Sequence, residues 1–209
     1  MAHENWKKKE VHILLFMDFV CEWCYLGKKI LDGLHEHYDF DVDYMFMEIH
    51  PDTPETGMPM KLHLHFPERF YALLNRLGMP YQIHFCDREV FSNTHQALLL
   101  GEVARQSGKA EAYVNALWDA YMVEGKNISD KRILAEIALS VGLSPQDADK
   151  PLYDGSYQAS LTRNERLSQT YGAQGQVPAF IVNNEYILTG AQSAETWIEL
   201  FKTINTERP

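Results

Sequence analysis

The sequence predicts an α/β fold in which a large helical segment interrupts one mixed domain. Residues 10–49 contain an apolar run, a helix-like pattern and an alternating run, an order typical of a β-α-β unit. Helical periodicity dominates the middle of the chain, and the last third reads as helix, two strands and helix. We therefore expect a discontinuous domain formed by residues 1–60 and 156–209, with an all-helical insertion at residues 61–155.

The opening β-α-β unit is built from short elements. Residues 10–17, "EVHILLFM", form an apolar run rich in Ile, Leu and Phe, which indicates a buried strand. Residues 24–38 repeat apolar side chains at helical spacing, and residues 41–49 alternate as a second strand would. Three prolines in "HPDTPETGMPM" then predict a loop that leads into the insertion.

The insertion is expected to hold four or five short helices. Ser92 can cap the second helix, and Ser144 and Pro145 suit the N-cap and first-turn positions of the last one. The predicted helical stretches are residues 67–78, 92–108, 109–125, 129–142 and 144–155.

The last third predicts a helix, a hairpin and a closing helix. A helix begins at about Ser156. The runs "AFIV" at 179–182 and "YILT" at 186–189 are strand-like and flank "NNE", a hairpin-type turn. Ser193 can then cap a final amphipathic helix that carries Trp197.

The charge of the chain restricts its partners. A formal net charge of -10, with 29 acidic residues, repels phosphate backbones, so we expect no nucleic-acid partner. No run approaches the roughly 20 apolar residues that span a bilayer, so we expect no membrane association. The basic cluster Lys7–Lys9 precedes an apolar run, but His12 and Asp18 interrupt that run and no small-residue cleavage site follows. We expect a cytoplasmic protein.

Two of the three cysteines, Cys21 and Cys24, form a Cys-x-x-Cys pair between the first strand and the first helix. Backbone N–H groups and the helix dipole at a helix start favour a thiolate, which is the reactive form of cysteine. Cys24 lies one helical turn further on and faces the same side. Position therefore predicts that Cys21 attacks a substrate and that Cys24 resolves the mixed disulfide.

Two other interpretations of the pair are weaker. A structural metal site needs about four ligands, and only Cys86 with His84 could join the pair, at a spacing that matches no standard half-site. We therefore expect no metal. Two inert buried thiols would not account for a pair placed at a helix start.

A second signal is "GQVPAF", in which Val177 and Pro178 directly precede a strand. A proline there is often only an edge or turn residue. Beside a Cys-x-x-Cys pair, a cis Val177–Pro178 bond that exposes backbone groups to an extended substrate is the better interpretation.

Other side chains also have two interpretations each. Trp23 forms a hydrophobic lip around the site or simply packs, and Asp18 hydrogen-bonds its turn or assists proton transfer. Cys86 is expected to be a small buried hydrophobe rather than a regulatory thiol. His63 and His65 are expected on the surface. The following aromatic residues are expected in the core rather than in a peptide groove: Tyr113, Trp118 and Tyr121.

These motifs together resemble the DsbA-like oxidoreductases of the thioredoxin superfamily, and within them the FrnE-like branch of cytoplasmic dithiol-disulfide isomerases. The stretch "DFVCEWCYLGKK" is similar to that family's active-site stretch, and "EIHPDTPETG" to its post-strand loop. "SNTHQA", "YMVEGKNISD" and "GQVPAFIVNNEYILTGAQ" resemble later segments, so the likeness extends from about residue 11 to 201.

The resemblance implies a thioredoxin-like fold, a nucleophile at Cys21, a resolving thiol at Cys24 and a cis Pro178. Glu22 departs from the pattern, which usually has proline there. A carboxylate beside Cys21 should oppose thiolate formation, make the pair less oxidising and leave the first helical turn less rigid. The alternative is a solvated Glu22 with little influence.

The expected function is that of a thiol–disulfide oxidoreductase or isomerase acting on protein thiols and disulfides, with no bound cofactor and with glutathione as a candidate co-substrate. One alternative is a glutathione-dependent isomerase or transferase, of the 2-hydroxychromene-2-carboxylate isomerase or kappa-class type. Those proteins need a single activated Ser or Cys, so Cys24 argues against that class. Another alternative is a non-catalytic peptide-binding module that uses the groove near Pro178.

Overall fold

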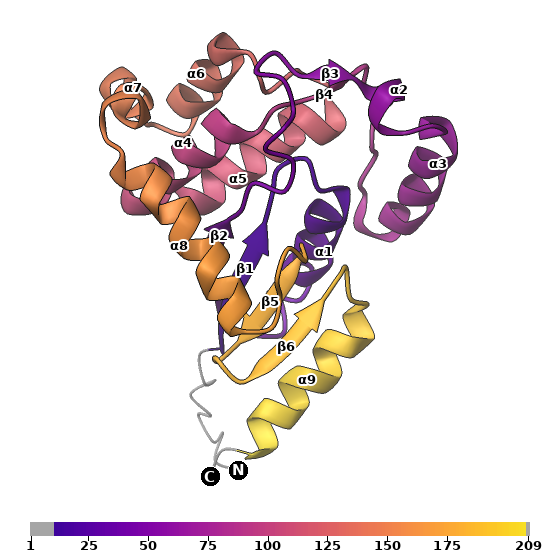
Figure 1. Ribbon diagram of the computed structural model, residues 1–209. Helices are drawn as coiled ribbons and strands as arrows, with labels where there is room; N and C mark the ends of the chain where they lie inside the picture. Colours follow the sequence, from indigo (N-terminus) through magenta and orange to yellow (C-terminus); the bar gives the residue numbers. More distant parts are fainter. Residues whose placement is uncertain (1–10, 208–209) are drawn as a thin grey trace.

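A four-stranded sheet joins the two ends of the chain in the computed structural model, which describes residues 11–207 (Figure 1). Its order is β2-β1-β5-β6. Strand β1 (Val11–Met17) pairs in parallel with β2 (Phe40–Phe46) and antiparallel with β5 (Ala179–Val182), which pairs antiparallel with β6 (Tyr186–Thr189). Because β1 and β5 are neighbours, the halves before and after the insertion form one thioredoxin-like sheet, which confirms the predicted fold class.

The central strands are buried on both faces. Every residue of β5 is fully buried, and so are Ile13 and Leu15 of β1, which explains their continuous apolar runs. Asn183 and Asn184 adopt positive φ angles of 53° and 59°, the conformation that a tight two-residue hairpin turn requires.

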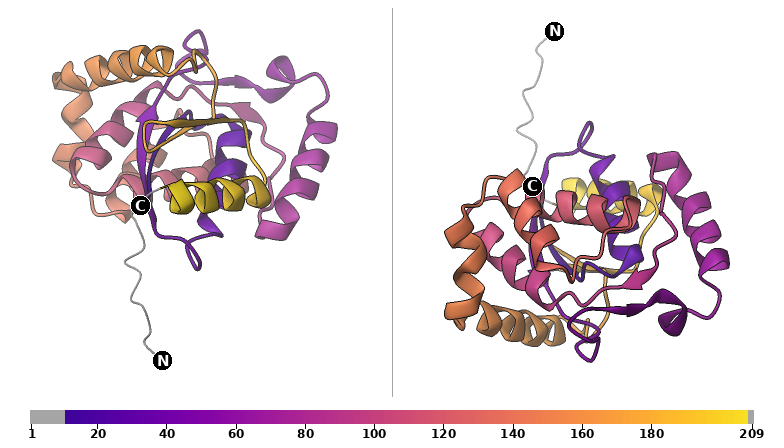
Figure 2. Two further views of the ribbon diagram at one scale, coloured as in Figure 1. Left: turned by 90° about the horizontal axis from the view of Figure 1, so that it is seen from below. Right: turned by 90° about the horizontal axis from the view of Figure 1, so that it is seen from above.

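Helices cover both faces of the sheet (Figure 2). Helix α8 (Ser156–Thr170) lies on one face, and α1 (Glu22–Asp32) and α9 (Ala194–Glu207) lie on the other. The Ser193 hydroxyl accepts a hydrogen bond from the Thr196 amide at 3.3 Å, so the predicted cap of the last helix is confirmed.

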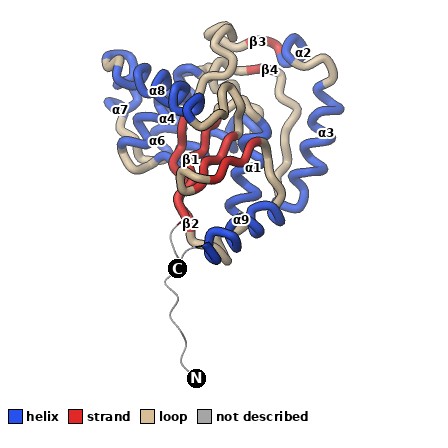
Figure 3. Tube along the Cα trace, turned by 60° about the horizontal axis from the view of Figure 1, so that its bottom comes forward, coloured by secondary structure: helices blue, strands red, loops and turns tan. Residues whose placement is uncertain are grey.

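The helical segment between β2 and α8 lies on two sides of the sheet (Figure 3). Helices α4 to α7 gather on one side, and α2 and α3 form an arm on the other. Their bounds are α2 (Met60–His63), α3 (Pro67–Gly78), η1 (Met79–Tyr81), α4 (His95–Gln106), α5 (Ala110–Trp118), η2 (Asp119–Val123), α6 (Lys131–Ser140) and α7 (Pro145–Tyr153). This segment is not purely helical, because the short strands β3 (Met58–Pro59) and β4 (Val90–Phe91) pair beside it. The division at residues 60/61 and 155/156 stays a prediction.

Two elements near the start of the chain begin or end at residues other than those predicted. The helix expected over residues 24–38 begins at Glu22 and ends at Asp32, and successive turns then bury Leu34. The strand expected over residues 41–49 ends at Phe46, because the Ile49 amide leaves the sheet and donates to a side chain.

Capping contacts explain where several helices of the insertion begin, compared with the predicted bounds. Helix α3 has the predicted bounds, and Ser144 forms a capping box with Asp147 next to Pro145, as predicted. Ser92 is not a cap, because its hydroxyl bonds the Asn127 side chain at 2.8 Å and α4 begins later, with Thr94 in the N-cap position. The third predicted helix divides into α5 and the π-helical turn η2.

Within residues 11–207, no helix combines the length and the apolar character that crossing a bilayer requires. The basic cluster Lys7–Lys9 and the expected first strand residue, Glu10, lie outside the described residues. The aromatic residues assigned to the core are there, as predicted: Tyr113, Trp118 and Tyr121.

Candidate active site

Cys21 occupies the N-cap position of α1, as the sequence predicts. Its backbone is extended, with φ -84° and ψ 102°, and its sulfur accepts a hydrogen bond from the Cys24 amide at 3.1 Å. The orphan N–H groups of a helix start therefore face this sulfur. Both cysteines are free thiols.

Cys24 has a different environment from Cys21. Its side chain is fully buried, whereas Cys21 is 7% exposed. Burial raises the pKa of the Cys24 thiol well above its usual value, and the hydrogen bond and charge of Cys21 raise it further. Cys24 is thus held as a protonated thiol while Cys21 remains accessible.

Val177 and Pro178 lie against the cysteines. The predicted cis peptide bond joins them, and the Cys21 thiol donates to the Val177 carbonyl oxygen over 3.6 Å. The Pro178 carbonyl accepts from the Gly190 amide at 2.8 Å, which fixes this turn to the end of β6.

A cavity of about 460 Å³ opens beside these groups. Five predicted site residues line it: Cys21, Glu22, Trp23, Val177 and Pro178. Cys24, which is fully buried, does not line it. The cavity therefore collects residues from a helix start and from a turn near the other end of the chain.

The opposite wall contains residues that the sequence analysis missed, namely His50, His63 and Phe91. The ring of His63 stacks on that of Phe91 at 3.6 Å, and His50 meets His63 edge-on at 5.0 Å. Burial lowers the pKa of both imidazoles, which favours their neutral form. His63 is half-buried on α2 of the insertion, where it lines this cavity, and His65 is exposed as expected.

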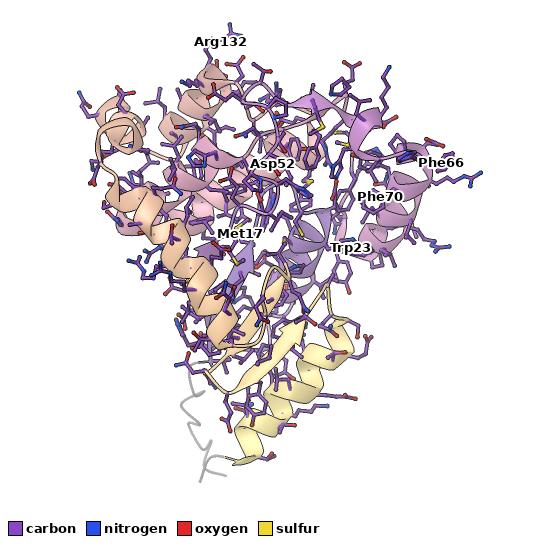
Figure 4. All side chains as sticks on the ribbon, viewed as in Figure 1. Met17, Trp23, Asp52, Phe66, Phe70 and Arg132 are labelled. Carbon is purple, nitrogen blue, oxygen red and sulfur yellow. The ribbon has the colours of Figure 1, made fainter. Side chains whose placement is uncertain are left out.

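Trp23 fits both of its interpretations. It lines the cavity, and its ring meets Phe70 of α3 edge-on at 6.3 Å. Figure 4 shows the two side chains in the space between α1 and α3. Trp23 thus connects the rim of the site with the helical arm.

Glu22 is not a solvated side chain. It is 12% exposed and forms an ion pair with Arg88, whose side chain is 1% exposed. Burial raises the pKa of Glu22, and the Arg88 charge opposes that rise. No local motif marks Arg88, which lies 66 positions further along the chain.

Asp18 is fully buried beneath the cysteine turn. Its carboxylate accepts hydrogen bonds from the amides of Ile49 at 2.8 Å and Val20 at 3.5 Å, so the expected turn role is confirmed. Burial raises the pKa of Asp18 to about 6, although these hydrogen bonds oppose the rise. The charge of Asp18 acts to raise the pKa of Cys24, whereas a hydrogen bond to the Asp18 backbone acts to lower it.

Cys86 lies outside the site. It is half-buried rather than buried as expected, and burial raises the pKa of its thiol. Within residues 11–207, the one group of three side chains close enough to share a metal ion is Asp32, His35 and Glu111, which includes no cysteine.

Comparison with known proteins identifies the family. Residues 12–202 match the DSBA-like thioredoxin domain. The chain belongs to this family. Among curated proteins, the uncharacterized protein YwbO of Bacillus subtilis is 26% identical over 183 residues, which cover 85% of this chain and 89% of YwbO.

Solved structures share the fold at low identity. A probable DsbA oxidoreductase, SCO1869 of Streptomyces coelicolor, has a TM-score of 0.86 and 21% identity, covering 95% of this chain and 92% of its own. The cytosolic disulfide reductase DsbM of Pseudomonas aeruginosa, with GSH, has a TM-score of 0.67 and 18% identity, covering 93% and 99%. A 2-hydroxychromene-2-carboxylate isomerase has a TM-score of 0.71 and 16% identity, covering 93% and 95%.

Proposed function

We propose that this DsbA-like protein exchanges disulfides with protein thiols through Cys21 and Cys24. The observation that carries the proposal is the asymmetry of the pair. One sulfur caps a helix at the edge of a cavity, and the other is fully buried one turn below it. That arrangement suits one attacking thiol and one resolving thiol.

The exchange proceeds in two steps that balance. The Cys21 thiolate attacks one sulfur of a substrate disulfide, whose S–S bond breaks and releases one substrate thiolate. Cys24 then loses its proton and attacks the Cys21 sulfur, which releases the second substrate thiolate and leaves a Cys21–Cys24 disulfide. The substrate is reduced and the protein is oxidised. The reverse sequence oxidises a substrate dithiol.

Asp18 is the group that we propose to accept the Cys24 proton. It is buried, it interacts with Cys24, and a pKa of about 6 suits a carboxylate that exchanges a proton near neutral pH. The Val177 carbonyl and the turn at Pro178 would hold an extended substrate across Cys21.

Glutathione is the co-substrate that we propose to return the pair to its starting state. The DsbM structure holds GSH in a related fold, and DsbM is described as cytosolic, which also supports our proposal of a cytoplasmic location. A single-thiol isomerase of the 2-hydroxychromene-2-carboxylate type would make no use of Cys24. The position of Cys24 therefore favours the dithiol reaction.

The test is mass spectrometry of thiols after equilibration in a series of glutathione buffers. We expect a reversible Cys21–Cys24 disulfide in the native protein and a trapped mixed disulfide in Cys24→Ser. Cys21→Ser should form neither. A pair that never forms a disulfide, or full glutathione-dependent turnover by Cys24→Ser, would contradict the proposal.

A further inference from the structure

Arg88 reaches the cysteine motif from the insertion. Its guanidinium forms an ion pair with Glu22, the residue that follows Cys21. It also lies over the ring of Tyr121 at 4.3 Å and near that of Tyr71 at 5.1 Å. A buried cation held between two aromatic rings and one carboxylate is fixed in position as well as paired.

The insertion holds Arg88 in place without help from Glu22. The Asn75 side chain exchanges two hydrogen bonds with the Phe85 backbone, at 2.7 Å and 3.1 Å. The Cys86 amide donates to the Met122 carbonyl at 2.9 Å. Met122 belongs to η2, a π-helical turn of the kind often found at functional positions. The same residue places its sulfur 2.7 Å from the guanidinium.

The charge of Glu22 matters because of where it lies. Glu22 is the first residue of α1, directly after Cys21, and it lines the same cavity. An unpaired carboxylate in this largely buried position would repel a thiolate on Cys21. With Arg88 beside it, the pair presents no net charge to the sulfur.

We propose that Arg88 is a positioning residue of the cysteine pair, which cancels the charge of Glu22 and so permits Cys21 to ionise. This inference rests on the proposed function, because it concerns the same thiolate. It makes the reactivity of the thioredoxin-like half depend on a side chain that the insertion supplies. Glu22 thereby occupies the usual proline position without the penalty that its charge alone would bring.

The competing explanation is that the Arg88–Glu22 ion pair only holds the structure together. The two explanations differ in the direction in which two substitutions shift thiolate formation at Cys21. Arg88→Met leaves Glu22 unpaired and should disfavour the thiolate. Glu22→Gln leaves Arg88 unpaired and should favour it. A purely structural role predicts the same direction for both, since both break the same contact.

The experiment measures how the rate of Cys21 alkylation by iodoacetamide depends on pH in the reduced full-length protein. We expect the midpoint to rise by about one pH unit in Arg88→Met and to fall in Glu22→Gln. The double variant should return close to the native midpoint, and Arg88→Lys should lie between native and Arg88→Met. The titratable groups around Cys21 that stay constant in this series are Asp18, Cys24, His50 and His63. Those around Arg88 that stay constant are Tyr71, Cys86 and Tyr121.

Arg105→Met is the matched control. Arg105 pairs at 2.8 Å with Glu102, a fully buried carboxylate on α4, away from the cavity. We expect Arg105→Met to lower the thermal midpoint and leave the Cys21 titration unchanged. If Arg88→Met does not fold, Glu22→Gln and Arg88→Lys still show in which direction the pair shifts the pH midpoint of Cys21 alkylation.

The inference about Arg88 would be overturned if the pH midpoint of Cys21 alkylation moved in the same direction in Glu22→Gln and Arg88→Met, or did not move in either variant. The proposed function has its own point of failure, because it is lost if the native pair never exchanges with glutathione. A protein that exchanges normally, with unshifted variants, would refute the role of Arg88 alone.

Discussion

The Cys21 sulfur lies 3.6 Å from the carbonyl oxygen of Val177, although 156 positions separate the two residues. The contact exists because β1 and β5 are neighbours in the sheet, so the turn before β5 returns to the helix start that follows β1. Cys24 takes no part in this contact and is buried one turn below. The two thiols of the motif are therefore chemically unequal before any substrate binds.

The first prediction concerns that inequality. In the folded, reduced protein, Cys21 should be alkylated at least about tenfold faster than Cys24 at neutral pH, because burial hides Cys24 and raises the pKa of its thiol. Mass spectrometry of peptides after timed alkylation measures both rates. The difference should disappear in urea, and comparable rates in the folded protein would contradict the prediction.

The second prediction concerns Gly27, where α1 packs closely against the sheet. A Cβ atom there would lie 3.3 Å from the Ala191 backbone and 3.3 Å from the ring of Phe180. Gly27→Ala should therefore lower the free energy of unfolding by about 1–3 kcal/mol, measured in urea. Gly155→Ala is the control, since its Cβ would meet nothing within 4 Å, and it should be neutral or slightly stabilising. Equal effects of the two variants would contradict this account.

Local signals carried most of what could be predicted of the fold. Residues 67–78 were predicted as a helix because Pro67 and Gly78 mark its ends, and the two hairpin strands because a pair of asparagines divides two apolar runs. The predicted first helix, residues 24–38, begins two residues late and extends beyond the observed end at Asp32. The turns after Asp32 bury Leu34, so the apolar spacing resembles that of a helix.

The candidate site was predicted on one side only. Cys21, Trp23 and Pro178 belong to short motifs that can be recognised without knowing the fold. The opposite wall depends on how the insertion folds over the sheet, and neither Arg88 nor His63 carries a local signature of that packing. His50 offered one usable signal, because it follows the carboxyl end of a parallel strand, where binding sites tend to form.

The third prediction concerns Asp18 and pH. Its pKa in the folded protein is about 6, above the unfolded value of 3.8, so the folded state holds a proton that the unfolded chain releases. The contribution of Asp18 to the free energy of unfolding should therefore fall as pH rises from about 4 to about 6, by about 3 kcal/mol for a shift of this size. Urea unfolding at both ends of this window measures the loss.

Asp18→Asn provides the comparison, because an amide oxygen can still accept from the Ile49 amide and carries no charge. This variant should be more stable than the native protein near pH 7 by about 1–3 kcal/mol, and it should lack the part of the loss between pH 4 and 6 that Asp18 contributes. It should also resolve a Cys21 mixed disulfide more slowly. Parallel pH profiles for the two proteins would show that Asp18 does not titrate in this window.

The fourth prediction concerns the wall of the cavity that the arm supplies. His63 stacks on Phe91 at 3.6 Å and lines the cavity, whereas His65, two positions later, is exposed. In turnover of a disulfide-linked peptide, His63→Ala should raise KM about three- to tenfold, the size expected for the loss of one aromatic contact, and change kcat less. His65→Ala should leave both constants unchanged. A His63→Ala protein with native KM would mean that substrates do not use this wall, and an equal effect of His65→Ala would point to a general disturbance of the arm.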